Sequence, residues 1–130
     1  MTWEIGEDEA RQILALPAED RYRSVLMLLA DWEEAWGLKD ENGWIVRSED
    51  GNEAFPLWPH STFAAACARG AWEGATPGAI SLDDLMESLL PLLEEDGILV
   101  EIFPTSEERG RVVEAEVFRK DLERELELGG

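Results

Sequence analysis

The side chains that most often carry catalysis are scarce in this chain. It contains one histidine, His60, and one cysteine, Cys67, and a Cys–His pair is one way to build a nucleophile. If a helix begins near His60, the separation from Cys67 spans two turns, roughly 10 Å along the axis. Direct proton transfer between the two side chains needs hydrogen-bond contact. The spacing therefore favours a small buried thiol and a histidine at a helix start over a catalytic pair.

The carboxylates are too numerous for any pair of them to indicate a catalytic acid and base. Thirty Asp and Glu are spread over most of the chain, so pairs at helical spacing, such as Asp31 and Glu34, arise by chance. The turn that begins at Asp40 differs from an EF-hand calcium loop, because its Gly43 does not stand at the sixth position that such a loop requires. Phosphate-binding glycine loops, Cys-x-x-Cys and Gly-x-Ser-x-Gly do not occur in the sequence. We expect no nucleotide cofactor and no zinc, while metal-free hydrolysis stays open.

Tryptophan is a more informative residue type, with six in 130 residues. Three of them fit core packing: Trp32, Trp36 and Trp44. Trp58, shortly before His60, lies where a predicted strand ends and a helix begins, and binding residues are common at such connections. Trp72 falls in a predicted loop, where no apolar periodicity predicts that it is buried. Tryptophan is also enriched at interface hot spots. The candidate partner- or ligand-binding residues are therefore Trp58, His60 and Trp72.

Net charge limits the class of partner. Thirty acidic against eleven basic side chains leave −19, and nucleic acids and anionic membranes bind clusters of Lys and Arg instead. The negative charge would attract a basic partner. The alternative is that it only keeps the protein soluble. The N-terminus has no signal-peptide pattern, no apolar run reaches the roughly 18 residues of a membrane span, and a lone cysteine suits a reducing compartment. We expect a cytoplasmic protein.

The first third of the chain has helical periodicity. Residues 7–16 predict a short helix that ends at Pro17. Apolar residues then recur at helical spacing, which predicts a second helix; they are Tyr22, Val25, Leu26, Leu29, Trp32 and Trp36. Gly37 is expected to end that helix.

The middle of the chain predicts strands joined by tight turns. Asn42-Gly43 suits a type I′ hairpin turn between Leu38 and residues 44–46. A second turn leads to residues 54–58, where Pro56 predicts a strand that lies at an edge or begins irregularly, because proline cannot donate to a ladder. We expect a three-strand meander over residues 36–58.

The second half alternates helices and strands. Its predicted elements are a short helix over residues 60–70, a loop over 72–77, a short strand at 79–80, a leucine-rich helix over 82–93 with Ser81 as its N-cap, a strand over 98–103, its hairpin partner at 111–113 and a helix over 114–126. Together these elements predict one α+β domain spanning residues 1–130. We expect a mixed, mostly antiparallel sheet of about five strands, with helices packed on it and a helical N-terminus.

Several stretches form a recognisable pattern: Arg21-Tyr22, Asp31-Trp32-Glu33-Glu34-Ala35-Trp36-Gly37-Leu38, Gly43-Trp44, Phe55-Pro56-Leu57-Trp58-Pro59, Trp72, the helix over 82–91, Glu95-Asp96-Gly97 and Phe103-Pro104. Over residues 15–126 the chain resembles the bacterial family called domain of unknown function 2750, which implies no activity, cofactor or site residue. The element order is also similar to that of SseB-type N-terminal domains and of small immunity proteins that neutralise toxins, a fold-level likeness that does not transmit function.

Two functional hypotheses follow from the sequence. The leading one is a non-catalytic, acidic protein-binding module, an immunity or regulatory protein for a basic partner. The alternative is a small-molecule-binding protein, or an uncharacterised enzyme, with a pocket near Trp58, His60 and Trp72. The two differ in whether these aromatic side chains line a concave site.

Overall fold

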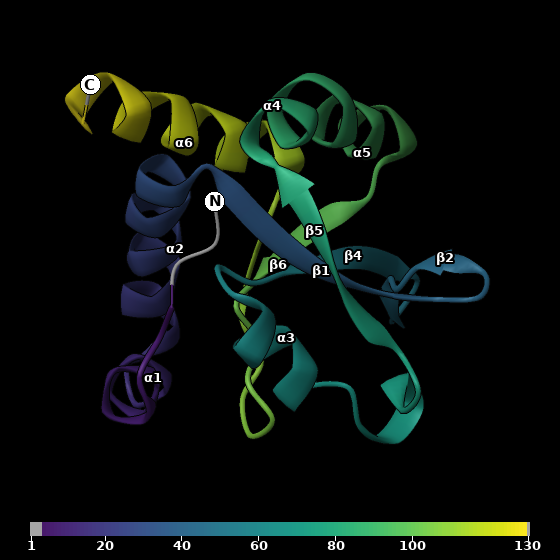
Figure 1. Cartoon of the computed structure of the whole chain (residues 1–130). Coiled ribbons are helices and arrows are strands. Elements are labelled where there is room, and N and C mark those ends of the chain that lie inside the picture. Colours follow the sequence, from purple (N-terminus) through teal and green to yellow (C-terminus); the bar gives the residue numbers. More distant parts are fainter. Residues whose placement is uncertain (1–3, 130) are drawn as a thin grey trace.

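Two small sheets form the framework of the protein (Figure 1). The computed structural model describes residues 4–129, with side chains up to Glu127. One sheet has the order β2–β1–β5, built from Gly43–Trp44, Glu34–Asp40 and Thr76–Ser81. The other has the order β3–β4–β6–β7, built from Arg47–Glu49, Asn52–Leu57, Leu99–Ile102 and Arg111–Val113. A bridge joins the two sheets where the backbones of Trp36 and Trp58 exchange two hydrogen bonds of 2.8 Å.

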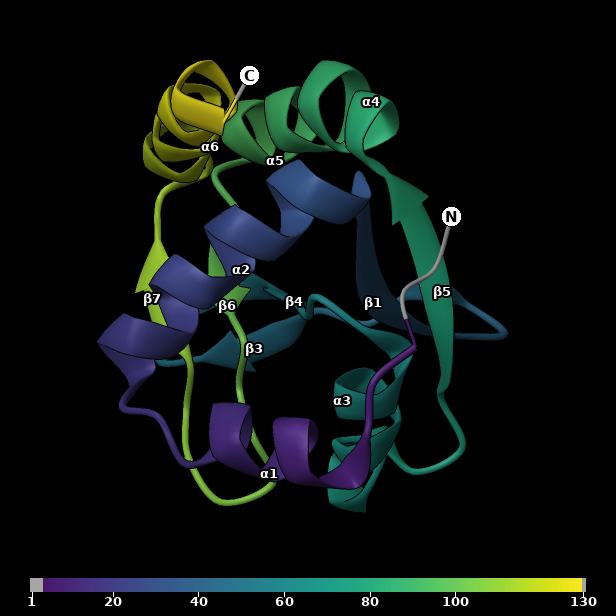
Figure 2. The same ribbon diagram turned by 60° about the vertical axis from the view of Figure 1, so that its left-hand side comes forward.

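The helices lie around these sheets. They are α1 (Glu7–Leu14), α2 (Ala18–Trp32), α3 (Ser61–Ala66), the short turn η1 (Gly70–Trp72), the consecutive segments α4 (Leu82–Asp84), η2 (Leu85–Leu89) and α5 (Leu90–Asp96), and α6 (Ala115–Gly129). The α4–α5 helix and α6 lie at one end of the molecule, and α1 and α3 lie at the other (Figures 1 and 2). Among the residues described, no helix combines the length and apolarity needed to cross a membrane.

The α+β class and the mostly antiparallel pairing are confirmed. Within residues 4–129 the structure has seven strands in two sheets, where the sequence predicted about five in one. Only β4 and β6 pair in parallel, while the pairings β1–β2, β1–β5, β3–β4 and β6–β7 are antiparallel. The division into two sheets is the main departure from the expected architecture.

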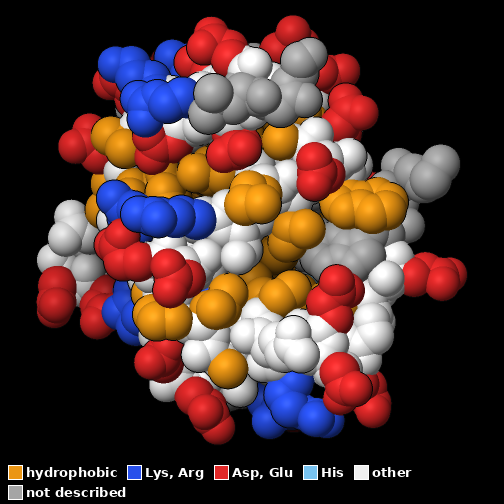
Figure 3. All heavy atoms as spheres, turned by 90° about the vertical axis from the view of Figure 1, so that its left-hand side faces the viewer, with side chains coloured by type: hydrophobic (Ala, Val, Ile, Leu, Met, Phe, Trp, Pro, Cys, Tyr) orange, Lys and Arg blue, Asp and Glu red, His pale blue; other side chains and the backbone are white. Residues whose placement is uncertain are grey.

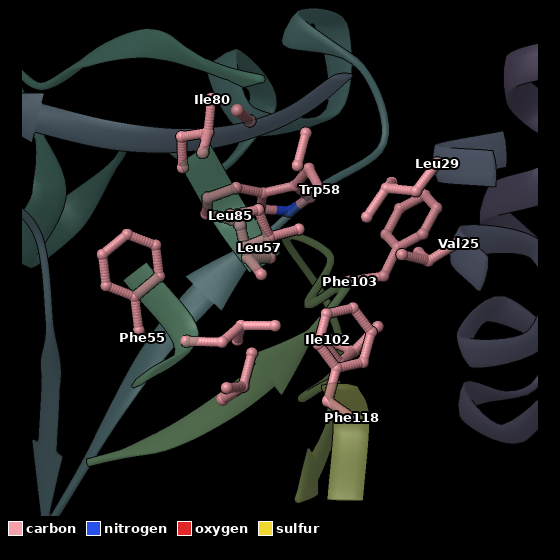
Figure 4. Close-up of a cluster of buried hydrophobic side chains, with 14 of the residues drawn as sticks. Val25, Leu29, Phe55, Leu57, Trp58, Ile80, Leu85, Ile102, Phe103 and Phe118 are labelled. Carbon is pink, nitrogen blue, oxygen red and sulfur yellow. The ribbon is translucent and has the colours of Figure 1, made fainter. Parts of the chain in front are cut away.

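Side chains from α2, the second sheet and α6 meet in the core. Figure 4 shows Val25 and Leu29 of α2 lying toward Phe103, with Phe118 of α6 beside Ile102. All five are fully buried. Burying one such side chain contributes roughly 1.5–3 kcal/mol, so this cluster fixes the sheet on which the site is built.

The second helix is shorter than its apolar periodicity predicted. It ends at Trp32, because Glu33 adopts the left-handed conformation at φ 56°. Trp36 and Gly37 therefore lie in β1, which corrects the prediction that Gly37 ends the helix. The reason is tertiary, since Trp36 makes the bridge to Trp58 and the pairing of β1 with β5 outweighs helical spacing.

The expected meander is divided between the two sheets. β2 pairs with β1, whereas β3 pairs with β4 in the other sheet, so residues 36–58 do not form one meander. The first hairpin exists, but its loop is Glu41-Asn42, because Asp40 pairs with Gly43. Of the four residues from Asp40 to Gly43 only Gly43 has positive φ, and the Asp40 side chain accepts a 2.8 Å hydrogen bond from the Asn42 N–H. This side-chain bond shifts the turn one residue earlier than the type I′ prediction.

Pro56 lies inside the second sheet, which corrects the edge-strand prediction. β4 runs between β3 and β6. The Leu57 carbonyl accepts from the Phe103 N–H at 2.8 Å, so Leu57 faces β6 and Pro56, one residue earlier, faces away from it. On that side the pairing of β4 with β3 ends at Arg47 opposite Ala54, before it reaches Pro56. The backbone N–H that proline lacks would therefore have no acceptor in β3.

The second half follows the prediction more closely. The Ser81 hydroxyl accepts a 3.1 Å hydrogen bond from the Asp84 N–H, which confirms the N-cap. β6 and its hairpin partner β7 are confirmed by the pairing of Val100 with Val113. β5 is longer than predicted, because it pairs along β1 over the whole of Thr76–Ser81. This long-range register is not contained in its local sequence.

Candidate functional site

A cleft of about 1020 Å³ opens between three chain segments at the α3 end of the molecule. Its walls are residues 45–49 around β3, residues 66–72 from the end of α3 through η1, and residues 105–109 of the β6–β7 connection. Figure 2 shows that connection and α3 at the same end of the molecule, away from α6. We call this concavity the arginine cleft.

Three of the nine arginines of the chain line the cleft: Arg47, Arg69 and Arg109. Three glutamates line it as well: Glu49, Glu107 and Glu108. The formal charge of the lining is thus zero in a chain that carries −19. The lining of the cleft is therefore less acidic than the chain as a whole.

A fully buried carboxylate holds two of these arginines. Glu101 of β6 has no exposed surface and accepts hydrogen bonds from Arg47 Nε (2.8 Å), Arg109 Nε (3.0 Å) and the Gly110 N–H (2.9 Å). Arg109 also donates from Nη1 to Glu49. Hydrogen bonding to Glu101 is the main reason that the pKa of Arg109 is raised above its ordinary value. A buried charge with these partners fixes both guanidinium groups in position.

Arg47 also contacts an aromatic ring that lines the same cleft. Its guanidinium carbon lies 4.6 Å from the centre of the Trp72 ring, within cation–π range. Trp72 in turn meets the edge of Trp58, with ring centres 6.3 Å apart and an interplanar angle of 86°. Trp58 is fully buried. Arg47 and Trp72 therefore form the floor of the cleft, and Trp58 packs beneath Trp72 in the core.

The 105–109 wall is fixed from below. The carbonyl of Pro104 accepts from Trp58 Nε1 (2.8 Å) and from Cys67 Sγ (3.4 Å). Thr105 Oγ1 accepts from the N–H groups of Glu107 and Glu108. The wall is thus bonded to the core before any ligand arrives, and pre-organisation of this kind reduces the entropic cost of binding.

Arg21 anchors the same wall from α2. It is fully buried and donates to the carbonyls of Phe103 (3.1 Å) and Arg109 (3.1 Å), and to the Glu108 carboxylate (2.9 Å). Phe103 itself has φ 59°, a conformation that costs a non-glycine residue of order 1–3 kcal/mol. The bonds from Arg21 offset that cost at the point where the chain leaves β6.

The three predicted binding residues separate in the structure. Trp72 is half-buried and lines the cleft. Trp58 lies behind Trp72 in the core. His60 is buried and its Nδ1 accepts from the Thr62 N–H at 3.1 Å, which caps α3. The three residues therefore do not form one pocket: Trp72 lines the cleft, Trp58 packs behind Trp72, and His60 packs against Phe63 at the start of α3.

Sequence reasoning missed the arginines and Glu101. One signal was present, because Glu101 is a charged residue inside the most apolar predicted strand, and a buried charge requires a partner. Which arginine supplies that partner depends on β3 and on the β6–β7 connection, far from each other in the sequence. No local pattern identifies Arg47 and Arg109 as neighbours.

The chemistry of the cleft favours holding a group over transforming it. Burial raises the pKa of the Cys67 thiol, which keeps it protonated and weakly nucleophilic. The single histidine of the chain, His60, caps the opposite end of α3. Within residues 4–129 no three His, Cys, Asp or Glu side chains gather as a metal site. The groups that the cleft does present are guanidinium N–H donors, three carboxylates, the Trp72 ring and aliphatic side chains such as Ile45 and Val46.

Comparison with known proteins gives a family without an assigned activity. A family model described as "Protein of unknown function (DUF2750)" matches residues 22–122, which include the whole cleft lining as well as Trp58, His60 and Trp72. No curated protein matches the chain. The fainter likeness to SseB-type domains stays a prediction.

Proposed function

This chain belongs to the DUF2750 family, and from the geometry of the arginine cleft we propose that it is a non-catalytic binding protein whose basic partner protein inserts a segment of its chain into that cleft. The observation that carries the proposal is the floor of the cleft, where Arg47 is fixed between the buried Glu101 and the Trp72 ring. Tryptophan and arginine, both half-buried here at the floor of a concavity, are residue types enriched at interface hot spots.

Size supports a protein segment as the occupant. Pockets for single small molecules measure roughly 300–1,000 Å³, and this cleft of about 1020 Å³ lies at the upper limit of that range. Its lining comes from three separate backbone segments, so an extended chain would contact all three at once. We regard an immunity or regulatory role as the form that such binding would take.

Charge supports a basic partner. Carboxylates are scattered around the face formed by α1, α2 and α6, with groups of basic side chains between them (Figure 3). The net charge of −19 attracts a cationic protein over distances up to about one Debye length, roughly 8 Å at physiological salt. Such attraction raises the association rate and makes it sensitive to salt. A cytoplasmic location, where no disulfide is required of the lone Cys67, completes the proposal.

Site-specific photo-crosslinking tests this proposal. A benzoylphenylalanine replaces Ser106, which lines the cleft, and in a matched control it replaces Ser88, an exposed residue of η2 at the other end of the molecule. We expect one basic protein to crosslink at position 106 and not at 88. The purified partner should then bind one to one, with an affinity at least about tenfold lower at 500 mM than at 50 mM salt. Equal crosslinking at both positions, or no one-to-one complex from purified components, would refute the proposal.

A small-molecule ligand is the second candidate. The Trp72 face beside two arginines is the specific observation that favours it, since small-molecule sites combine apolar walls with a few fixed polar groups. An enzyme of uncharacterised type is less favoured by the protonated Cys67 thiol. Native mass spectrometry of the purified protein distinguishes this candidate: a bound mass below about 1 kDa that is lost in Trp72→Ala supports it, and an unliganded wild-type mass counts against it.

A further inference from the structure

Two arginines of the cleft keep hydrogen-bond donors free. Arg47 uses Nε for Glu101, and its two terminal amino groups donate to no residue in the described part of the chain. Arg69 is exposed, and its side chain has no hydrogen bond or ion pair with any residue between 4 and 127. Arg69 lies just before η1, whose last residue, Trp72, packs against Arg47. The two guanidinium groups therefore line the same concavity with uncommitted N–H groups.

The remaining charges of the cleft are already matched. Glu108 pairs with Arg21, and Glu49 pairs with Arg109. Only Glu107 is left, an exposed carboxylate with no ion pair among the described residues. What the cleft still offers is thus two guanidinium groups and one carboxylate, which matches a ligand that carries a negative group and a positive group close together.

Arginine and carboxylate are complementary in shape. A guanidinium donates two parallel hydrogen bonds to the two oxygens of a carboxylate, and the pair is strongest where the arginine is held in place beforehand. Arg47 is held in this way, because Glu101 binds its Nε and the Trp72 ring covers one of its faces. Its terminal amino groups are the edge that remains for a ligand.

We propose that the cleft binds the C-terminal end of the partner protein, with Arg47 and Arg69 on its terminal carboxylate and Glu107 on a lysine or arginine side chain that precedes it. The inference rests on the proposed function, since it names the part of the partner that enters the same cleft. A segment basic enough to be attracted by this surface has few Asp or Glu, and the carboxylate that every chain has is its C-terminus. Capture of a terminal carboxylate is a recurring mode of peptide recognition.

The apolar lining indicates the last side chain of that segment. Ile45, Val46 and Trp72 line the cleft together with the arginines, so an aliphatic C-terminal residue would bury its side chain against them. This arrangement makes the terminal carboxylate, the last side chain and the preceding basic residue three separate contacts. Each can be removed from a peptide without changing the others.

A pair of short peptides tests the inference on the purified protein. The probe is the acetylated tetrapeptide glycine–lysine–lysine–leucine with a free C-terminus, compared with the same peptide as its C-terminal amide. We expect calorimetry to give a dissociation constant at least about tenfold lower for the free acid. The guanidinium NMR signals of Arg47 and Arg69 should shift with the acid and not with the amide.

Variants locate the binding. Arg69→Ala should reduce the difference between acid and amide to less than about twofold, and because Arg69 is exposed the variant should keep the stability of the wild type. Arg124→Ala, on α6 at the far end of the molecule and 70% exposed, should leave the difference unchanged. Arg47→Lys keeps the charge but loses the two-pronged geometry, and should weaken the acid selectively.

Equal affinity of acid and amide, or no binding of either at millimolar concentration, would overturn the C-terminal assignment. That result leaves the proposed function to be judged by the crosslinks at position 106, which do not depend on which part of the partner enters. Conversely, selective binding of the free acid that Arg69→Ala does not change would place the carboxylate elsewhere and refute the role of this cleft.

Discussion

Replacing Glu101 by glutamine tests the contact on which the cleft floor depends. Glu101 is fully buried and accepts three hydrogen bonds, from Arg47, Arg109 and the Gly110 N–H, at 2.8, 3.0 and 2.9 Å. Glutamine has nearly the same shape, so packing is conserved. It carries no charge, however, and its amide nitrogen must point at a donor where a carboxylate oxygen was. The substitution therefore isolates electrostatics from volume.

The magnitude follows from these contacts. A hydrogen bond to a charged group contributes roughly 1.5–3 kcal/mol. The sum over three such bonds is an upper limit on the stability that Glu101→Gln loses, and the actual loss should be smaller. Glutamine retains one acceptor oxygen, and the side chains of Arg47 and Arg109 are 29% and 45% exposed, so water can solvate them in part. We expect a loss of about 3 kcal/mol, the lower end of the range for breaking a buried ion pair. This is a large fraction of the roughly 5–15 kcal/mol that stabilises a domain.

Urea denaturation is the appropriate assay. With an m-value of about 1.5 kcal/mol/M, the loss moves the midpoint down by roughly 2 M while the slope stays constant. Glu107→Gln is the matched control, because Glu107 is exposed and makes no ion pair among the described residues, and it should change stability by less than about 0.5 kcal/mol. If Glu101→Gln falls within that same interval, the buried charge does not stabilise the fold and our account of the cleft floor is wrong.

Three further substitutions test the close approach at Gly110, the packing of Trp58 and the ionisation of Tyr22. Gly110→Ala should destabilise by about 1–3 kcal/mol in the same assay, because a Cβ there would lie 2.3 Å from the Ile102 carbonyl oxygen. Trp58→Phe should cost roughly 3 kcal/mol, because it removes the hydrogen bond to the Pro104 carbonyl and leaves a cavity in a fully buried position. Burial, together with a hydrogen-bonded carboxylate, raises the pKa of Tyr22 above its ordinary 10.0. The folded state therefore favours the protonated phenol, so the contribution of Tyr22 to folding stability is complete below pH 10 and is lost as the pH rises further. In Tyr22→Phe the free energy of unfolding should fall less steeply with pH in this range.

Two of these substitutions have a control substitution in the same chain, and the third is compared with the wild type. Gly6→Ala meets nothing within 4 Å and should be nearly neutral. Trp44→Phe changes a tryptophan that is 37% exposed and should cost clearly less than Trp58→Phe. For the alkaline slope, urea midpoints at several pH values between 8 and 11 compare wild type with Tyr22→Phe; parallel curves would contradict the assignment of the slope to Tyr22.

The sequence predicted those elements whose signals are local. The N-cap at Ser81 uses a hydroxyl and an N–H three residues apart, and β6 is an apolar run too short for a helix. Periodicity misled at Trp36, because helical spacing does not reveal that Glu33 adopts a left-handed conformation. The helix can end there because the backbone N–H and C=O of Trp36 form hydrogen bonds with the backbone of Trp58, which joins the two sheets.

The tryptophans show the same limit at the level of side chains. Trp32 and Trp44, expected in the core, are 36% and 37% exposed, whereas Trp58, a binding candidate, is fully buried. Exposure depends on which elements cover a residue, and the sheets that cover Trp58 pair over long sequence separations. Trp72 alone among the three candidates lines the cleft.

The amino-acid sequence by itself determined the α+β class, the acidic charge and the scarcity of nucleophiles, because composition and local spacing are properties of the unfolded chain as well. Only the tertiary structure decided where the few arginines lie. Arg47 and Arg109 are more than sixty residues apart, and they meet because each compensates the same buried Glu101. A charge inside a strand must find partners from whichever segments the fold brings to it, and that requirement placed the cleft.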